Sequence, residues 1–403
     1  MSKQLNILII GAGIGGLSAA LAFKRLGHGV RVVERVKEIR PVGAAISLWP
    51  NGVKVINQLG LGDTVQRQSG FVDHMRYLSA QGTPLTEFSL SPLFEAVAQR
   101  TYPVSRFALQ KTLFNAVGAE HIELGRNCVD FSIQADGVSA HFDTGDTLSA
   151  DLLIVADGTH SRLRNKMLGE SIERQYVGYV NWNVRVPANV NLTPQASWDQ
   201  YVGENKRVSF MPMGSGGNDQ GVEELYCFFD VPLPAGTAND PAKYREELKH
   251  HFRGWAKPVQ DLIDGFDPAL MARVEIHDIP PLRSLIAKHV VLLGDAAHGM
   301  APDLGQGACQ AMEDAWVLAN AVNEALKNSQ TPSETALVQA LAAYDEARAP
   351  RVGDIVTRAR KRAELIHGTN GEKTQAWYGE LATEDGSSII NGIKQTILAG
   401  PLG

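Results

Sequence analysis

The chain has 403 residues, of which 44% are apolar and 20% are charged, and it carries a formal net charge of −6. This composition excludes a disordered tail and is typical of a globular protein long enough for more than one domain. The acidic balance argues against a nucleic-acid partner, and no apolar stretch has the length and character of a membrane span. Three scattered cysteines without a CxxC pair indicate a reducing compartment, so we expect a cytoplasmic protein.

The N-terminal residues predict a strand, a helix and a second strand. An apolar run from Leu5 to Ile10 leads into GAGIGG, a helical pattern covers Ser18 to Leu26, and a second apolar run ends at Glu34. In a dinucleotide-binding unit, GxGxxG glycines allow the tight turn and the close approach of a pyrophosphate, and the acid accepts a ribose hydroxyl. The pattern therefore predicts a Rossmann-like unit. The acid suits both NAD and the adenosine half of FAD, and a tight turn without a ligand is the alternative.

Two further apolar strands end in polar, glycine-containing turns. The run DLLIVA is followed by Asp157-Gly158, and the run HVVLL leads into GDAAHGMAPDLGQG and then a long helix. Glycines let backbone N–H groups approach a ligand closely, and the start of the helix is electropositive. Three such strand ends on the carboxyl edge of one sheet could bind one long ligand. Taken alone, Asp157 could equally be an aspartate that begins a turn.

The remaining pattern predicts a sheet inserted into this nucleotide-type unit. A glycine-rich stretch, Gly214 to Gly221, is expected to join two strands as a hairpin, and the chain is mostly helical after Glu313. The expected helices are 51–59 and 109–117; the expected strands or strand pairs are 75–88, 122–142, 151–156, 207–211, 225–231 and 290–293, within a strand-rich region 176–278.

We therefore predict an α/β fold with a discontinuous Rossmann-like FAD-binding domain, an inserted mixed or antiparallel-sheet substrate domain and a helical C-terminus. The expected parts are 1–74, 101–175 and 279–345 for the FAD-binding domain, 75–100 and 176–278 for the substrate domain, and 346–403 for the C-terminal helical segment.

The chain resembles the single-component FAD-dependent aromatic hydroxylases over nearly its whole length. The resemblance is carried by three segments in this order: GAGIGG, the Asp-Gly segment and GDAAHGMAPDLGQGACQAMEDA. Several other segments resemble the bacterial members that hydroxylate urate. These segments are KEIRPVGAAISLWPNGVK, GYVNWN, GENKRVSFMP, YCFFDVPLPAG, VEIHDI and IINGIKQTILAGPLG. The hairpin tip, residues 214–224, is longer than in those enzymes.

The resemblance implies one noncovalent FAD per chain and no metal ion. It places the adenosine and pyrophosphate at the first glycine turn and the ribityl chain and flavin ring at the third strand end. The implied cofactor residues are Gly11, Gly13, Gly15, Gly16, Glu34, Arg35, Ser47, Arg106, Cys128, Asp157, Asp295, Gly305, Gln306, Gly307, Ala308 and Cys309. Arg106 is expected at the start of a helix, where the positive end of the helix dipole disfavours a cation unless the cation faces an anion such as a pyrophosphate.

The resemblance also implies that Asn181, Arg207 and Tyr226 bind the substrate, and that Arg207 and Tyr226 contribute to catalysis. Because Arg207 and Tyr226 lie on the two strands of the expected hairpin, they could face the same side. A guanidinium fork suits a planar, anionic, carbonyl-rich heterocycle. A strand-surface arginine and a core tyrosine are the open alternative. For His298 we expect a helix-capping or packing role rather than that of a base.

The implied reaction is the hydroxylation of urate at C5 to 5-hydroxyisourate with NADH and O₂, through a flavin hydroperoxide. A second GxGxxG is absent from the sequence, so we expect NADH to bind transiently. One alternative is a flavin hydroxylase of a salicylate-type or hydroxynicotinate-type acid, and another is a nucleotide-binding protein without turnover. Preference for NADH over NADPH and the choice between monomer and homodimer stay open.

Overall fold

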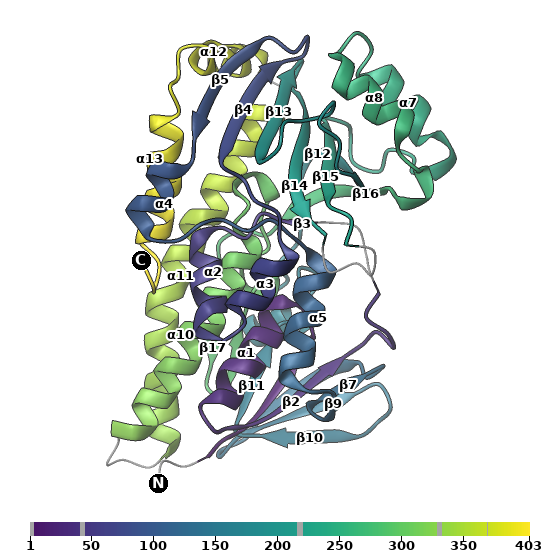
Figure 1. The fold of residues 1–403 in the computed structure, drawn as a ribbon. Helices are drawn as coiled ribbons and strands as arrows, with labels where there is room; N and C mark the ends of the chain where they lie inside the picture. The colour runs from purple at the N-terminus through teal and green to yellow at the C-terminus, as the bar shows by residue number, and fades with distance from the viewer. Residues whose placement is uncertain (1–3, 41–44, 216–220, 329–332, 369) are drawn as a thin grey trace.

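The computed structural model describes residues 4–40, 45–215, 221–328, 333–368 and 370–403. Its lower half in Figure 1 contains a six-stranded sheet covered by helices, and its upper half contains a seven-stranded sheet. One long helix, α11 (Ser333–His367), runs along both halves. The two sheets are therefore bridged by a single continuous element.

The lower sheet confirms the expected strand–helix–strand unit. Its order is β17-β18-β11-β1-β2-β7, and all neighbouring pairs are parallel except β17 with β18. The strands are β1 (Asn6–Ile10), β2 (Gly29–Glu34), β7 (Ile122–Leu124), β11 (Leu152–Val155), β17 (Ile286–Ala287) and β18 (Val290–Leu292). The wholly apolar runs in β11 and β18 are buried because parallel sheets are covered on both faces. The carboxyl ends of β1, β11 and β18 meet at one edge, as expected.

Helices and two small sheets complete this half. They comprise α1 (Ile14–Arg25), α2 (Pro50–Gln58), α3 (Gly62–Gln68), α5 (Arg106–Val117), α6 (Arg162–Leu168), α9 (Asp295–His298) and α10 (Gly307–Asn328), the hairpin strands β8 (Cys128–Ile133), β9 (Val138–Phe142) and β10 (Thr147–Ala150), and the pair β3 (Ala45–Ile46) and β6 (Val104–Ser105). The expected helices at 51–59 and 109–117 are confirmed as α2 and α5, and the strand pairs expected at 122–142 as β7 to β9.

The upper sheet has the order β16-β12-β15-β14-β13-β4-β5 and is antiparallel except between β13 and β4. Its strands are β4 (His74–Ser79), β5 (Pro84–Ser89), β12 (Gln175–Pro187), β13 (Ser197–Gly203), β14 (Lys206–Gly214), β15 (Glu224–Val231) and β16 (Ala272–Asp278). The expected hairpin is confirmed, with β14 paired to β15; residues 216–220 of its tip lie outside the described part.

Alternation along these strands separates the two faces of the upper sheet. On β14, Val208 and Phe210 join an apolar core with Phe229 of β15, whereas Arg207 and Met211 face the other side. Two helices that we did not predict, α7 (Tyr244–His251) and α8 (Lys257–Gly265), cover the apolar face. We read their region as strands alone, and these helices are only 8 and 9 residues long.

The C-terminal part is helical, as predicted. It contains α11, α12 (Gly371–Leu381) and α13 (Ser387–Leu398), and α13 packs beside α4 (Ser91–Val97). Because α11 runs without a break through residue 345, the expected boundary between 345 and 346 falls inside a helix. The division into domains otherwise stays a prediction.

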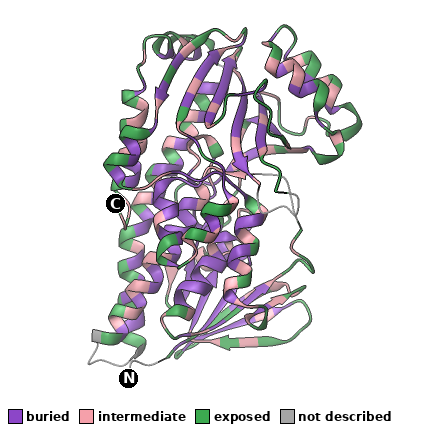
Figure 2. Ribbon diagram, viewed as in Figure 1, coloured by how far each residue is buried: buried purple, intermediate pink, exposed green. Residues whose placement is uncertain are grey.

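Buried residues, purple in Figure 2, run through the strands of both sheets and the helix faces turned toward them. Hydrophobic burial is thus the main stabilising contribution in both halves. Among the described helices none is both long and apolar enough to cross a membrane.

Candidate functional site

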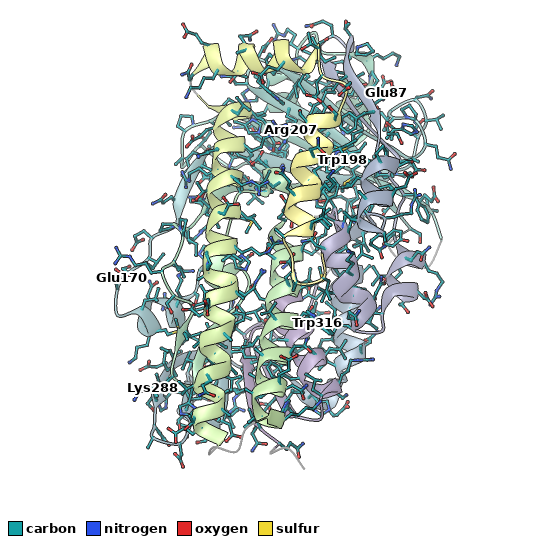
Figure 3. All side chains as sticks on the ribbon, turned by 90° about the vertical axis from the view of Figure 1, so that its left-hand side faces the viewer. Glu87, Glu170, Trp198, Arg207, Lys288 and Trp316 are labelled. Atoms are coloured by element: carbon teal, nitrogen blue, oxygen red, sulfur yellow. The ribbon has the colours of Figure 1, made fainter. Side chains whose placement is uncertain are left out.

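A cavity of about 710 Å³ lies where the two halves meet. Its walls come from the first glycine turn, the end of β18, the start of α10, the polar face of the upper sheet and the inner sides of α11 and α13. This volume falls within the range of ligand sites. Figure 3 labels Arg207 and Trp198, which both line the cavity, in the upper half of the molecule.

The first glycine turn contributes two kinds of glycine. A Cβ on Gly11 would overlap the carbonyl oxygen of Ala156, and Gly11 has a φ of 109°, in the left-handed region. A Cβ on Gly16 would overlap the carbonyl of Gly11, so both positions are required for close packing. A Cβ on Gly13, by contrast, would meet no atom within 4 Å, and Gly13 lines the cavity. The turn therefore leaves open space at the N-terminus of α1, where a pyrophosphate would bind.

The third strand end forms the opposite part of the cofactor wall. Asp295, Gly305 and Gly307 all line the cavity, and Gly307 is the first residue of α10. Gly305 has a φ of 63°, and a Cβ there would overlap Ser47 Oγ and Trp49 Nε1. A side chain at 305 would thus both strain the backbone and disturb the neighbouring wall. The start of α10 directs its free N–H groups toward the cavity.

Asp157, at the end of β11, has a buried Oδ1 without a hydrogen-bond partner. Burial raises the pKa of this carboxyl, and Ser161 and Arg164 only partly oppose that effect. Its neighbours Ala156 and Gly158 line the cavity. An unpaired buried acceptor requires an explanation, and a polar ligand at this edge supplies one.

The other expected cofactor residues divide into those that line the cavity and those behind it. The cavity is lined by Gly13, Gly15, Ser47, Arg106, Asp295, Gly305, Gln306, Gly307 and Ala308, whereas Gly11, Gly16, Glu34, Arg35, Cys128, Asp157 and Cys309 lie outside its lining. The Glu34 carboxylate accepts from the backbone N–H groups of Ala12 at 2.9 Å and Val36 at 3.1 Å. It therefore fixes the glycine turn in the structure, and its contact with a ribose stays a prediction.

The structure brings together the three expected substrate residues. Asn181 on β12, Arg207 on β14 and Tyr226 on β15 line the same cavity and are at most 9% exposed. Their shared face follows from the strand register, in which Arg207 pairs with Asp230 and Met211 with Tyr226. The prediction that Arg207 and Tyr226 face one side is confirmed.

Arg207 already has carboxylate partners. Its Nε donates to Asp230 Oδ2 at 2.8 Å, and its Nη2 donates to Asp303 Oδ1 at 3.0 Å. Asp303 belongs to the short 3₁₀ turn Pro302–Leu304, just before Gly305 and the start of α10. His367, the last residue of α11, places its Nε2 3.7 Å from Asp230 Oδ2 and 3.8 Å from Asp303 Oδ1. We call Arg207, Asp230, Asp303 and His367 the cavity cluster.

Electrostatics keep the Arg207 guanidinium charged. Burial by itself would lower the pKa of Arg207, but Asp230 and Asp303 outweigh this effect and raise it. Burial, followed by the Asp230 charge, raises the pKa of Tyr226, so its phenol is a neutral hydrogen-bonding group. The upper sheet therefore presents to the cavity the fixed cation of Arg207 and the neutral hydroxyl of Tyr226.

Sequence reasoning missed several residues in this wall and directly behind it. Asp303 and Asp230 were not assigned roles, although Asp303 stands inside the quoted APDLGQG segment. Asn183, two residues after Asn181 on the same face, donates to Asn181 Oδ1 at 2.9 Å and leaves its own buried Oδ1 unpaired. The repeated asparagine in GYVNWN was the available signal, because alternate strand positions share a face.

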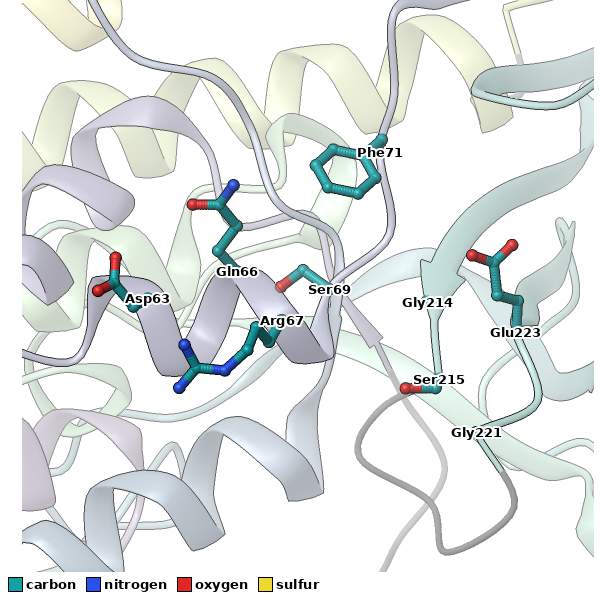
Figure 4. Close-up of a pocket in the computed structure, with 9 residues that line it drawn as sticks. All are labelled: Asp63, Gln66, Arg67, Ser69, Phe71, Gly214, Ser215, Gly221 and Glu223. Carbon is teal, nitrogen blue, oxygen red and sulfur yellow. The ribbon is translucent and has the colours of Figure 1, made fainter.

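A second cavity, of about 450 Å³, lies beside α3 and the ends of β14 and β15 (Figure 4). It is lined by Asp63, Gln66, Arg67, Ser69, Phe71, Gly214, Ser215, Gly221 and Glu223. None of the expected site residues is among them. Within the described ranges, no group of three or more histidine, cysteine, aspartate or glutamate side chains is arranged to bind a metal ion.

His298 has the packing role that we expected. Its Nε2 lies 2.7 Å from Asp314 Oδ2, in a buried ion cluster between α10 and α11, away from the cavity lining. His298 is therefore not part of the cavity wall.

Comparison with known proteins agrees with this geometry. Residues 4–359 match the family model for the FAD binding domain. The FAD-dependent urate hydroxylase of Klebsiella pneumoniae is 47% identical over 400 residues, which are 99% of this chain and 100% of that enzyme. The urate hydroxylase of Mycolicibacterium vanbaalenii is 43% identical over 99% of this chain and 98% of its own length.

Solved structures show the same fold. The crystal structure of the Klebsiella pneumoniae enzyme complexed with FAD and uric acid superimposes with a TM-score of 0.93 at 45% identity and covers 100% of this chain and 99% of that one. The fold predicted from the sequence, a Rossmann-like unit with an inserted sheet and a helical C-terminus, is confirmed. The chain belongs to the FAD-binding-domain family of flavin-dependent hydroxylases, of which the bacterial urate hydroxylases are members.

Proposed function

We propose that the protein is an FAD-dependent monooxygenase that hydroxylates urate at C5 to give 5-hydroxyisourate, with NADH and O₂ as co-substrates. The observation that carries the proposal is that Asn181, Arg207 and Tyr226 share one cavity with the cofactor turns. The full-length similarity to urate hydroxylases, one of them solved with uric acid, supports urate as the occupant.

The cofactor wall suits FAD. The open space at Gly13, the unpaired Asp157 Oδ1 and the N-terminus of α10 are spaced along one sheet edge, as one long dinucleotide requires. Asp295 would accept hydroxyls of the ribityl chain, and Arg106 at the start of α5 would face the pyrophosphate. Bound FAD, once reduced by NADH, would supply the activation of O₂ and the transfer of one oxygen atom.

The substrate wall suits a urate anion. The Arg207 guanidinium, fixed at one edge by Asp230 and Asp303, presents its remaining N–H groups to an anionic ring. The unpaired Oδ1 of Asn183 is available to accept an N–H of a purine, which a simple phenolic acid lacks. Tyr226 adds a neutral hydroxyl. Together these groups would orient the ring so that C5 faces the flavin, because alignment governs group transfer.

The surroundings of the reaction are part of the same proposal. NADH would bind transiently, because we found no second GxGxxG in the sequence. A cytoplasmic location fits three free cysteines, Cys128, Cys227 and Cys309. The protein would act as a monomer or homodimer.

A test of this function starts from the purified protein, which should be yellow and bind one FAD per chain. NADH oxidation should be slow alone and should accelerate with urate, with 5-hydroxyisourate formed. Acceleration by salicylate-type acids without any response to urate would favour the other hydroxylase class. A protein that does not bind FAD would refute both. Replacing Asp295 by alanine should weaken FAD binding roughly tenfold to hundredfold, because a charge-assisted contact is lost.

A further inference from the structure

The cavity cluster contains a histidine without a partner for one of its nitrogens. His367 is buried, its side chain being 1% exposed, and its Nε2 has no hydrogen bond. Its Nδ1 lies 3.0 Å from the backbone carbonyl oxygen of Asn205. Because a carbonyl can only accept, Nδ1 must carry a proton. The neutral ring therefore turns a bare lone pair at Nε2 toward two carboxylate oxygens.

Those two oxygens are the same ones that hold Arg207. Asp230 Oδ2 and Asp303 Oδ1 lie between the guanidinium on one side and the imidazole on the other. With a neutral imidazole the cluster has two negative charges and one positive charge. Burial lowers the pKa of His367, and Arg207 adds to that effect, while the two aspartates oppose it. Without a ligand the cluster is therefore one positive charge short.

An anion in the cavity increases this imbalance. Arg207 and Asp303 line the cavity, whereas His367 lies behind them. An anionic ring that binds Arg207 shares the guanidinium with both aspartates and adds a further negative charge beside buried ionic groups. Buried charges of one sign are costly unless an opposite charge compensates them. A proton on Nε2 would provide that charge directly between the two carboxylates.

We infer that His367 takes up one proton when the anionic substrate binds against Arg207, so that substrate binding and protonation of this histidine are coupled. The inference rests on the proposed function, because it takes urate as the anion. His367 is a positioning residue, since it acts through the two aspartates and does not touch the substrate. Its proton comes from solvent on binding and returns there when the ligand leaves.

The other groups around His367 do not replace it as proton acceptor. The Tyr179 ring stacks on it at 4.2 Å and donates its hydroxyl to Asp303 at 2.7 Å, and burial raises the pKa of that phenol well above its usual value. The Tyr378 hydroxyl, from α12, accepts from the backbone N–H of Asn205. Lys206 is turned away and bonds to Glu204 and a backbone carbonyl. The uptake is therefore assigned to the imidazole.

The experiment measures proton uptake on urate binding to the FAD-loaded enzyme without NADH. Calorimetric titrations at one pH near neutrality, in two buffers of different ionisation enthalpy, give the number of protons taken up. The wild type is expected to take up about one proton and His367→Gln none. The control His277→Gln, which changes a histidine outside the cavity lining, should match the wild type. Hypoxanthine is uncharged at neutral pH, so its binding should cause no proton uptake by the enzyme.

A second measurement uses the wild type alone, in case His367→Gln does not fold. The urate dissociation constant should rise by up to about tenfold per pH unit between the pKa of His367 in the free protein and its higher pKa in the complex, since binding takes up a proton only in that range. Urate binding that is independent of pH, or equal uptake by His367→Gln, would overturn the inference while leaving the function intact. Absence of urate binding would instead remove the proposed function, and the inference with it.

Discussion

Two buried ion clusters in this protein differ in their balance of charge. The first lies between α10 and α11 and contains Glu313, Asp314, Arg348, Arg351 and His298; we call it the helix cluster. Arg348 donates to Glu313 at 2.6 Å and to Asp314 at 2.7 Å, and Arg351 donates to Glu313 at 2.8 Å. Two guanidinium groups thus match two carboxylates.

The cavity cluster also has two carboxylates, those of Asp230 and Asp303, but only one guanidinium. Its remaining neighbour is the unpaired Nε2 of His367, at more than hydrogen-bond distance from both acids. In the helix cluster the guanidinium and carboxylate charges balance, and the ion pairs join two helices. The charges of the cavity cluster balance only when His367 Nε2 carries a proton. This cluster borders the cavity. The comparison indicates that the cluster at the cavity is distinguished by its missing positive charge, because both clusters contain buried ions.

The largest effect is expected from breaking the balanced cluster. Replacing Arg348 by methionine leaves two buried carboxylates with one guanidinium fewer, so the free energy of unfolding should fall by about 3–5 kcal/mol. Denaturant unfolding of the FAD-free protein measures it. The control Arg31→Met removes a partly exposed pair with Glu123 and should cost less than about 1 kcal/mol. Equal losses in both variants would show that the helix cluster contributes no special stability.

In the cavity cluster, the same kind of change should affect substrate binding and coupling. Arg207→Gln keeps a hydrogen-bonding group but removes the charge and the fork, so urate should bind roughly tenfold to hundredfold more weakly. Urate hydroxylated per NADH should also fall, with peroxide rising, because a misaligned ring misses the oxygen. A matched control is Arg185→Gln, which changes a partly exposed arginine paired with Glu224. Wild-type affinity and coupling in Arg207→Gln would make Arg207 a structural residue.

The pH dependence of stability sharpens the contrast. Burial raises the pKa of Asp314, but His298 and Arg348 outweigh this effect and lower it from 3.8 to about 2. Its stabilising contribution is therefore present above pH 3.8 and is lost as pH falls through about 2. The stability difference between wild type and Asp314→Asn should narrow over that window by on the order of 2 kcal/mol. Denaturant unfolding at several acidic pH values measures it; a constant difference would contradict the lowered pKa.

The smallest effect is expected for Tyr226→Phe. Tyr226 lines the cavity and is 9% exposed, and its phenol is expected to make a single contact to the substrate, so its loss removes one hydrogen bond. Urate affinity should fall by about 1 kcal/mol, roughly fivefold, with a smaller loss of coupling than in Arg207→Gln. Tyr179→Phe, which removes the donor to Asp303, is a useful comparison because it alters the cavity cluster from outside the cavity lining. A larger loss in Tyr226→Phe than in Arg207→Gln would reverse the proposed ranking.

Sequence alone determined the parts of this protein that depend on local chemistry. In the first turn, Gly11 and Gly16 have no room for a Cβ, and the Glu34 carboxylate accepts from the backbone of the same turn, so a dinucleotide site was predictable from the spacing of these residues. The expected hairpin also allowed Arg207 and Tyr226 to face one side, and the strand register of the structure confirms that they do. The cofactor and substrate classes came from segment resemblance, and the comparisons agree with them.

Tertiary structure alone decided the partners of Arg207. Asp230 lies on the neighbouring strand β15, and Asp303 lies in the 3₁₀ turn before α10. His367 is the last residue of α11, a 35-residue helix. Alternation gives the face on which a side chain lies, but not which distant element packs against that face. The short helices α7 and α8 were missed for a related reason, since their stability depends on packing against the upper sheet. The four residues of the cavity cluster come from four separate elements. Their charges therefore come together, and the positive charge is missing, only in the folded chain.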